Sequence, residues 1–139
     1  MNLEHLLTDG DRQIRETVRD FTKKEIIPNT KKLEADYKFV EEVHQKLVDI
    51  GIQASGYPAE YGGGDGSNMA FAIIAEELAK GDAGIALTVG INMSIILKPA
   101  IVVKNKVVMD KFIPSFCSGK LAYACISMTD EAGGADSEN

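Results

Sequence analysis

The residues with the clearest chemical potential stand near the end of the chain, where an apolar run, Cys125–Met128, leads into a glycine-rich turn, Thr129–Asp136. Gly133 and Gly134 would let the backbone approach a ligand closely and present N–H groups to an anion. The hydroxyl of Thr129, at the expected end of a strand, is placed to donate a hydrogen bond. The same residues also suit a simple hairpin turn, which is a common structure, so ligand binding is one of two interpretations at this point.

A second glycine-rich stretch, GYPAEYGGGDGSN from Gly56 to Asn68, invites comparison with phosphate-binding loops. It lacks the Gly-Lys-Ser/Thr of a P-loop, and Ser67 occupies the place of the third glycine in the dinucleotide-binding pattern. The stretch therefore predicts a tight loop that leads into a helix capped by Ser67 or Asn68.

The cysteines and histidines do not have the spacing of a metal site. Cys117 and Cys125 lie eight residues apart without a CxxC pattern, and His5 and His44 are far from each other. We therefore expect no metal site. No signal-peptide pattern precedes the cysteines, so we expect reduced thiols and a cytoplasmic location.

Length and charge set the class of the protein. The chain has 139 residues, enough for one domain, with 45% hydrophobic and 26% charged residues, as in folded soluble proteins. The formal net charge is −6, and no basic cluster is longer than two lysines, so we do not expect nucleic acid as a partner.

Apolar residues recur at helical spacing through most of the chain, which predicts an all-α fold: a bundle of five or six helices followed by a strand-like segment. We expect Pro28 to close the first helix, Gly51 to end the second in a left-handed conformation, and Pro114 to stop the last. The expected helices cover residues 8–27, 39–50, 68–80, 83–103 and 107–113, and the strand-like run covers residues 121–128.

The stretch over residues 83–103 is apolar all round, so it is expected to lie in a protein core or in lipid. Lys98, Pro99, Gly84 and Gly90 interrupt it and favour the core, and we expect no membrane association.

Four titratable residues on the predicted helices are candidates for a catalytic role. We expect His44 to be a partly exposed helix histidine, because no carboxylate or second histidine is spaced to work with it. Glu76, Glu77 and Asp110 are expected to be exposed, as carboxylates on amphipathic helices usually are. None of them is assigned as a catalytic base.

Several segments, in order along the whole chain, resemble the N-terminal helical domain of the acyl-CoA dehydrogenases, flavoproteins that oxidise acyl-CoA thioesters. The segments that carry the resemblance are VRDFTKKEIIP, QKLVDIGI, PAEYGGGDG, AIIAEELAKGDAGIAL, KFIPSFCSGK and MTDEAGGAD. The last lies over the family signature Thr-Glu-Pro-x-Ala-Gly-Ser-Asp. The resemblance implies that residues 1–121 form the N-terminal helical domain and that residues 122–139 begin the middle β domain.

In this family the signature binds the flavin, so the resemblance implies FAD as cofactor. It places the hydroxyl of Thr129 near flavin N5 and assigns main-chain contacts to Ile126, Met128 and Gly134. Ala135 replaces the signature serine, whose hydroxyl contacts pyrophosphate groups of flavin or CoA, and so offers weaker cofactor or thioester binding. Asp130 and Glu131 replace the family's Glu-Pro.

The resemblance also implies a substrate site. The helix over residues 83–97 would help to line the cavity for the fatty chain, with Thr88 and Asn92 as rare polar points on it. The alternative is that both residues face neighbouring helices as packed, hydrogen-bonded side chains. No catalytic residue is assigned, because the family's base comes from a C-terminal domain.

Two functions remain open from the sequence. The first is the N-terminal part of an acyl-CoA dehydrogenase, inactive alone, with acyl-CoA as substrate, electron-transfer flavoprotein as acceptor and a homo-oligomer or the missing domains as partners. The second is a non-catalytic helical subunit, or one chain of a split enzyme, that no longer binds flavin. In the first case we expect exposed apolar faces, which the missing domains would cover, and a tendency to self-associate.

Overall fold

The computed structural model describes residues 4–125 and 127, and within them it contains seven α-helices and no strand. Short 3-10 and π-helical turns extend or join several of these helices. The α-helices are α1 (Asp9–Phe21), α2 (Thr30–Ala35), α3 (Tyr37–Asp49), α4 (Asn68–Ala79), α5 (Ala83–Ile91), α6 (Lys98–Val102) and α7 (Lys106–Cys117). The 3-10 turns are η1 (Glu4–Leu6), η3 (Ile27–Asn29) and η4 (Ala59–Tyr61), and the π-helical turns are η2 (Thr22–Ile26) and η5 (Asn92–Ile96).

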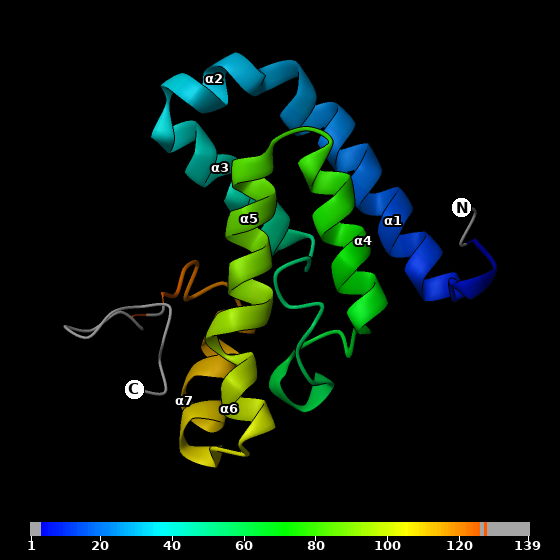
Figure 1. Cartoon of the computed structure of the whole chain (residues 1–139). Helices are drawn as coiled ribbons and strands as arrows, with labels where there is room; N and C mark the ends of the chain where they lie inside the picture. Colours follow the sequence, from blue (N-terminus) through cyan, green and yellow to red (C-terminus); the bar gives the residue numbers. More distant parts are fainter. Residues whose placement is uncertain (1–3, 126, 128–139) are drawn as a thin grey trace, which may run out of the picture.

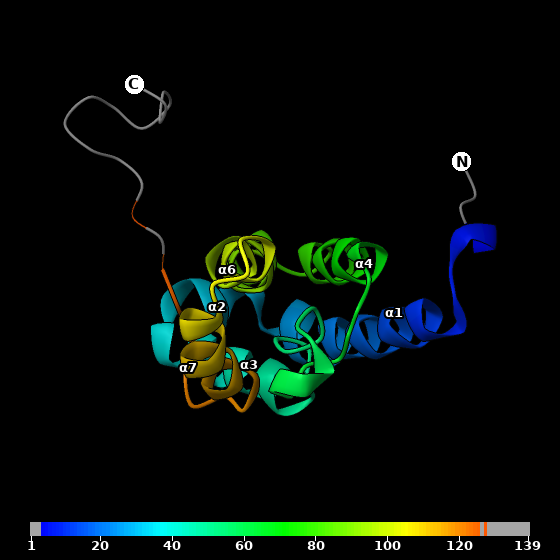
Figure 2. The ribbon, with the colours of Figure 1, turned by 90° about the horizontal axis from the view of Figure 1, so that it is seen from below.

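The helices form two layers. Figure 2 shows α4 and the run of α5 to α6 lying above α1, α2, α3 and α7. In Figure 1, α4 lies between α1 and α5, and it packs extensively against both. The predicted all-α bundle is therefore confirmed.

The main core lies where these layers meet. Its most buried side chains come from α1, η2, α3, α4, α5 and η5, and they are Val18, Ile26, Val43, Leu47, Ile74, Leu78, Val89 and Met93. Each such side chain contributes about 1.5–3 kcal/mol when it leaves water. A smaller cluster of Tyr57, Leu97, Ile113 and Phe116 joins α7 to the glycine-rich loop and to the end of η5.

The predicted helix ends are confirmed where they depend on local chemistry. Thr8 and Asp11 form a reciprocal capping box at the start of α1. Ser67, rather than Asn68, caps α4 through a 3.0 Å hydrogen bond that its hydroxyl accepts from the N–H of Ala70. Gly51 follows α3 with a φ of 79°, as expected for a helix end in the left-handed region.

One of the two helix ends predicted at proline is confirmed, and the other is wrong. The helical run of α1 and η2 ends at Ile26, and Pro28 lies in the separate 3-10 turn η3, near its start, where the missing N–H costs little. Helix α7 continues past Pro114 to Cys117. Its extension is favoured by Phe116, which is fully buried beyond the proline.

The predicted strand is not formed in the described residues. Leu121–Cys125 adopts neither helix nor strand. A strand is stabilised by hydrogen bonds to a neighbouring strand, and the described part of the chain provides none. Backbone groups of this stretch bond to the side chains of Gln53 and Asn92 instead.

Ala83–Val102 is the one helical run in the described residues that, with 20 residues and a high mean hydropathy, is long and apolar enough to cross a membrane. Length and composition alone are weak evidence for a spanning helix, because buried core helices share them. Here Ile85, Val89 and Met93 on one side of the run lie in the protein core. The other side borders the groove described next.

Candidate functional site

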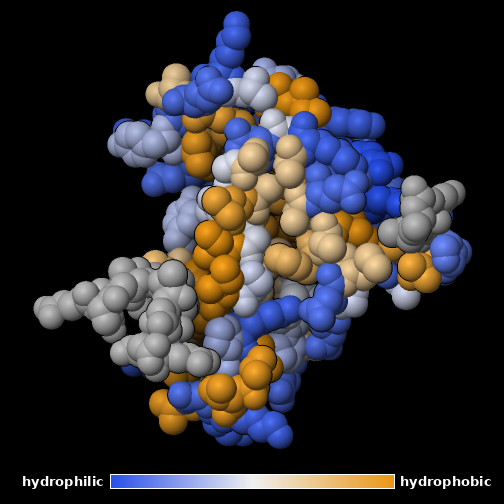
Figure 3. Space-filling view, viewed as in Figure 1, coloured by the Kyte–Doolittle hydropathy of each residue, from blue (hydrophilic) through white to orange (hydrophobic). Residues whose placement is uncertain are grey.

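The most apolar cavity found in the described residues is an open groove between α4 and the run formed by α5 and η5, with a volume of about 390 Å³. Figure 3 shows hydrophobic side chains gathered in a strip over α5 on this face of the molecule. The groove is lined by Phe71, Ala75, Ala79, Ala83, Ala86, Leu87, Gly90, Ile91, Ser94 and Ile95.

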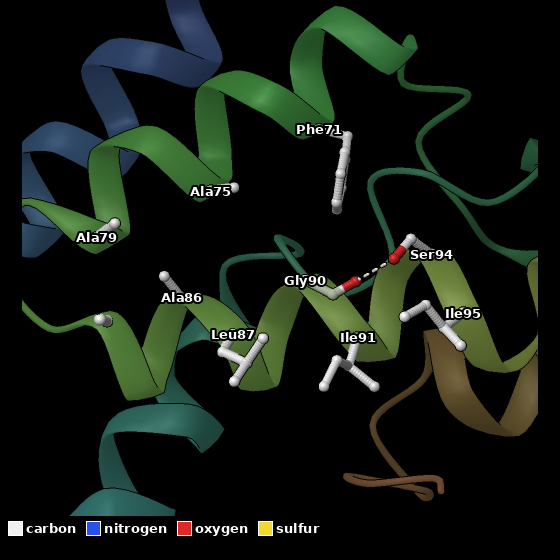
Figure 4. Close-up of a pocket in the computed structure, with 10 residues that line it drawn as sticks. Phe71, Ala75, Ala79, Ala86, Leu87, Gly90, Ile91, Ser94 and Ile95 are labelled. Carbon is white, nitrogen blue, oxygen red and sulfur yellow. Dashed lines mark hydrogen bonds between the residues drawn. The ribbon is translucent and has the colours of Figure 1, made fainter. Parts of the chain in front are cut away.

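Small side chains create the groove. In Figure 4, Ala86 of α5 points toward α4, which carries Ala75 and Ala79, and the ring of Phe71 lies over the helix near Gly90. A Cβ added to Gly90 would lie 3.9 Å from the Phe71 ring, so a longer side chain there would enter the groove. Sequence reasoning missed these residues, although alanine and glycine at helical spacing on two consecutive helices are a readable signal for a gap between them.

The groove offers almost no hydrogen-bonding capacity. Its single hydroxyl, on Ser94, donates a 2.6 Å hydrogen bond to the carbonyl of Gly90 within the same helical run. At the exposed edge, residue Leu87 is 63% exposed to solvent. Such a surface suits a hydrocarbon chain, because it offers apolar area and no competing polar partner.

The two residues predicted to contact substrate lie elsewhere on this helical run. Thr88 does not line the groove. Asn92 is buried, and its amide bonds to the backbone of Ala122 and Ala124 rather than facing the groove. Their substrate contact therefore stays a prediction, and the geometry of Asn92 corresponds to the packed, hydrogen-bonded alternative.

The residues predicted to bind flavin fall at the end of the chain. Ile126, Met128, Thr129, Gly134 and Ala135 lie outside the described residues. Their flavin contacts stay predictions from the resemblance.

His44 is not partly exposed as predicted: it is 2% exposed, and its ring stacks on Tyr123 with 4.4 Å between ring centroids. Burial lowers the pKa of His44, which favours the neutral ring. The error arose because Tyr123 is far away in the sequence, and only folding brings its ring over α3.

Glu77 is also not exposed as predicted. Its side chain is 2% exposed and accepts hydrogen bonds from Arg19 (2.7 and 3.2 Å) and Lys80 (2.9 Å). Burial alone would raise the pKa of Glu77, but the hydrogen bonds and positive charges of Arg19 and Lys80 outweigh it and lower the pKa. Glu77 therefore holds α1 against α4 as a carboxylate.

The other two carboxylates do not reach the groove either. Glu76 is exposed beside Lys80, and Asp110 accepts a 2.9 Å hydrogen bond from the hydroxyl of Tyr61. Neither residue lines the groove, and neither does Glu77, so the described residues provide no carboxylate base there.

The described part of the chain shows neither a cluster of metal-binding side chains nor an activated cysteine thiol. No group of three or more His, Cys, Asp or Glu side chains within it could hold a metal ion. Burial raises the pKa of Cys117 to about 11, so its thiol is protonated at neutral pH and is a poor nucleophile.

Comparison with known proteins decides the family. The model of the acyl-CoA dehydrogenase N-terminal domain matches residues 8–120. The chain belongs to the acyl-CoA dehydrogenase family. The match covers α1 to α7 and ends just before the stretch at Leu121–Cys125.

Named relatives agree with this assignment. The short-chain specific acyl-CoA dehydrogenase of Sus scrofa mitochondria is 26% identical over 130 residues, which are 94% of this chain and 31% of that protein. A probable acyl-CoA dehydrogenase of Bacillus subtilis (strain 168), YngJ, is 32% identical over 95 residues, 67% of this chain and 24% of that protein. The chain thus spans less than a third of the length of these curated relatives.

Solved structures share the fold. Butyryl-CoA dehydrogenase from Megasphaera elsdenii superposes with a TM-score of 0.80 at 28% identity, over 94% of this chain and 35% of that chain. An acyl-CoA dehydrogenase from Bacillus anthracis, solved in complex with FAD, gives a TM-score of 0.83 at 23% identity, over 94% of this chain and 22% of that chain. At that identity the second likeness shows the fold alone.

Proposed function

We propose that this chain is the N-terminal part of a flavin-dependent dehydrogenase that oxidises acyl-CoA thioesters between their α and β carbons, and that the groove between α4 and α5 is one wall of its acyl pocket. The apolar groove is the observation that carries the assignment to an acyl chain. Family membership supports the reaction class.

The role of the described residues is to bind and to exclude water. Ala75, Ala86 and Gly90 leave room for a chain of methylene groups, and Leu87 and Ile91 add apolar area at the edge. Each methylene buried in such a groove contributes about 0.8 kcal/mol to binding. The Ser94 hydroxyl already donates its hydrogen bond to the Gly90 carbonyl. The groove therefore presents almost entirely apolar surface to a bound acyl chain.

The reaction needs two groups that the groove does not supply. A carboxylate must remove the α proton, and bound FAD supplies the acceptor for the β hydride. No carboxylate lines the groove, so the base must belong to another part of the enzyme. The groove is also unsuited to the polar ring edge and pyrophosphate of FAD, because it has one hydroxyl and no charged side chain.

FAD binding is therefore proposed only through Ile126, Met128 and the signature residues Thr129–Asp136, by resemblance to the family. Electron-transfer flavoprotein is proposed as the acceptor on the same ground. Neither proposal assigns a contact to the described residues.

Titration with an acyl-CoA that carries an environment-sensitive fluorescent fatty chain tests the groove. We expect its emission to rise on binding to the chain and the affinity to fall about tenfold or more in Gly90→Leu, because the new side chain fills the space beside Phe71. Unacylated CoA should not displace the probe from the groove.

Gly84→Leu is the matched control, since it adds the same side chain at an exposed position of the same helix outside the groove. Equal losses in both variants would refute the groove as the acyl site. Unchanged affinity in Gly90→Leu would refute it as well.

A further inference from the structure

Three buried polar side chains converge on the short stretch Leu121–Cys125. His44 comes from α3, Gln53 from the turn after α3, and Asn92 from the start of η5, and each is 2% exposed. Figure 1 shows this stretch, in orange after α7, turning back toward the side of α5. Burying polar groups is costly unless they are hydrogen-bonded, so their common target indicates a specific role for these contacts.

The amide of Asn92 holds the backbone of this stretch at two points. Its Nδ2 donates to the carbonyl of Ala122 (3.3 Å), and its Oδ1 accepts from the N–H of Ala124 (3.4 Å). In an extended chain the backbone groups of residues two apart point to the same side. One side-chain amide thus replaces the donor and acceptor that a neighbouring strand would offer.

The other two side chains hold the flanks of this contact. Gln53 donates to the carbonyl of Leu121 (3.2 Å), and His44 stacks on the ring of Tyr123. Gln53 leaves its Oε1 without a partner among the described residues, whereas both ends of the Asn92 amide are bonded. Asn92 is therefore the residue that fixes both the position and the direction of the stretch.

The helix that carries Asn92 is itself held in place. The carbonyl of Asn92 accepts a 2.7 Å hydrogen bond from the hydroxyl of Tyr57, which is fully buried. Asn92 is also the first residue of the π-helical turn η5, and such turns shift the register of a helix by one residue. Tyr57 and the π turn together aim the Asn92 side chain.

We propose that Asn92 is a positioning residue for the segment that leads into the glycine-rich signature. The bond to Ala124 lies five residues before Thr129, so it sets where the chain leaves the helical domain on its way to that signature. The link between Asn92 and flavin binding rests on the proposed function. The hydrogen bonds from Asn92 to Ala122 and Ala124 do not depend on that function.

Hydrogen–deuterium exchange of the whole chain, read by mass spectrometry, tests the contact without flavin. We expect Asn92→Ala to raise exchange of the Ala124 amide about tenfold, because Asn92 accepts the hydrogen bond of that N–H. In the same variant, amide exchange in α1 and α4 should rise only by the amount that the lower free energy of unfolding predicts. Asn92→Asp keeps an acceptor for the Ala124 N–H and should restore part of the protection.

Val89→Ala is the control, because it removes a core side chain from the same helix and leaves both hydrogen bonds of the Asn92 amide in place. It should raise exchange throughout the core and show no selective effect at residues 121–125.

If Asn92→Ala does not fold, Ala124→Pro removes the bonded N–H from the other side and should raise exchange at its neighbours. Unchanged exchange at 121–125 in the folded variants, or a rise no larger than in Val89→Ala, overturns the proposal. A failed acyl-CoA titration would overturn the proposed function and leave this result standing.

Discussion

The buried carboxylate of Glu77 gives the sharpest test of how the two helical layers are joined. Glu77→Gln keeps the shape of the side chain and removes its charge. Complete loss of a partner from a buried ion pair costs about 3–5 kcal/mol, and exposed pairs contribute less than about 1 kcal/mol. Glu77 is 2% exposed, but Arg19 and Lys80 are 41% and 48% exposed, so water screens the cationic side. We therefore expect the free energy of unfolding to fall by about 2 kcal/mol.

Thermal and urea unfolding followed by circular dichroism measure this change. For a chain of 139 residues a loss of about 2 kcal/mol corresponds to roughly 8 °C in the midpoint temperature. Glu76→Gln is the matched control, because its carboxylate also contacts Lys80 but is largely exposed, and its midpoint should equal that of the wild type within error.

The pH dependence of this difference gives a second check. The pKa of Glu77 in the folded chain lies below its ordinary value of 4.5, so its stabilising effect is complete above about pH 4.5 and is lost as the pH falls through the folded pKa. The gap between the wild type and Glu77→Gln should therefore narrow as the pH falls below about 4.5. Equal midpoints for the Glu77 and Glu76 variants at neutral pH, or a gap that is constant down to about pH 3, would refute this account.

Two further predictions concern single positions. Ser67→Ala should lower the free energy of unfolding by about 1 kcal/mol in urea titrations, because it removes the cap of α4, while Asn68→Ala should have little effect; equal losses would contradict the assignment of the cap. Gly63→Ala should destabilise the chain strongly, since an added Cβ would lie 2.0 Å from the carbonyl oxygen of Tyr57, whereas Gly10→Ala meets only an ordinary contact at 3.7 Å; similar midpoints of thermal unfolding for the two variants would show that the loop adapts.

The accuracy of the sequence predictions depended on how far apart the interacting residues lie. Ser67 bonds to a backbone group three residues ahead, and Gly51 needs only its own backbone freedom, so both helix ends were readable from the sequence. The helical stop expected at Pro114 failed because packing of the later residue Phe116 favoured continued helix. The candidate groove was missed because its lining comes from two helices whose relative position the sequence does not state.

The sequence by itself determined the helical class, most helix starts and the family resemblance, because apolar spacing and caps act within a few residues. Only the tertiary structure decided that Glu77 meets Arg19 and that His44 lies under Tyr123. It also turned Asn92 toward the backbone of residues 122–124. Such contacts depend on which surfaces meet when the layers pack, and the energy of that packing is shared among many side chains, so no single stretch of sequence specifies them.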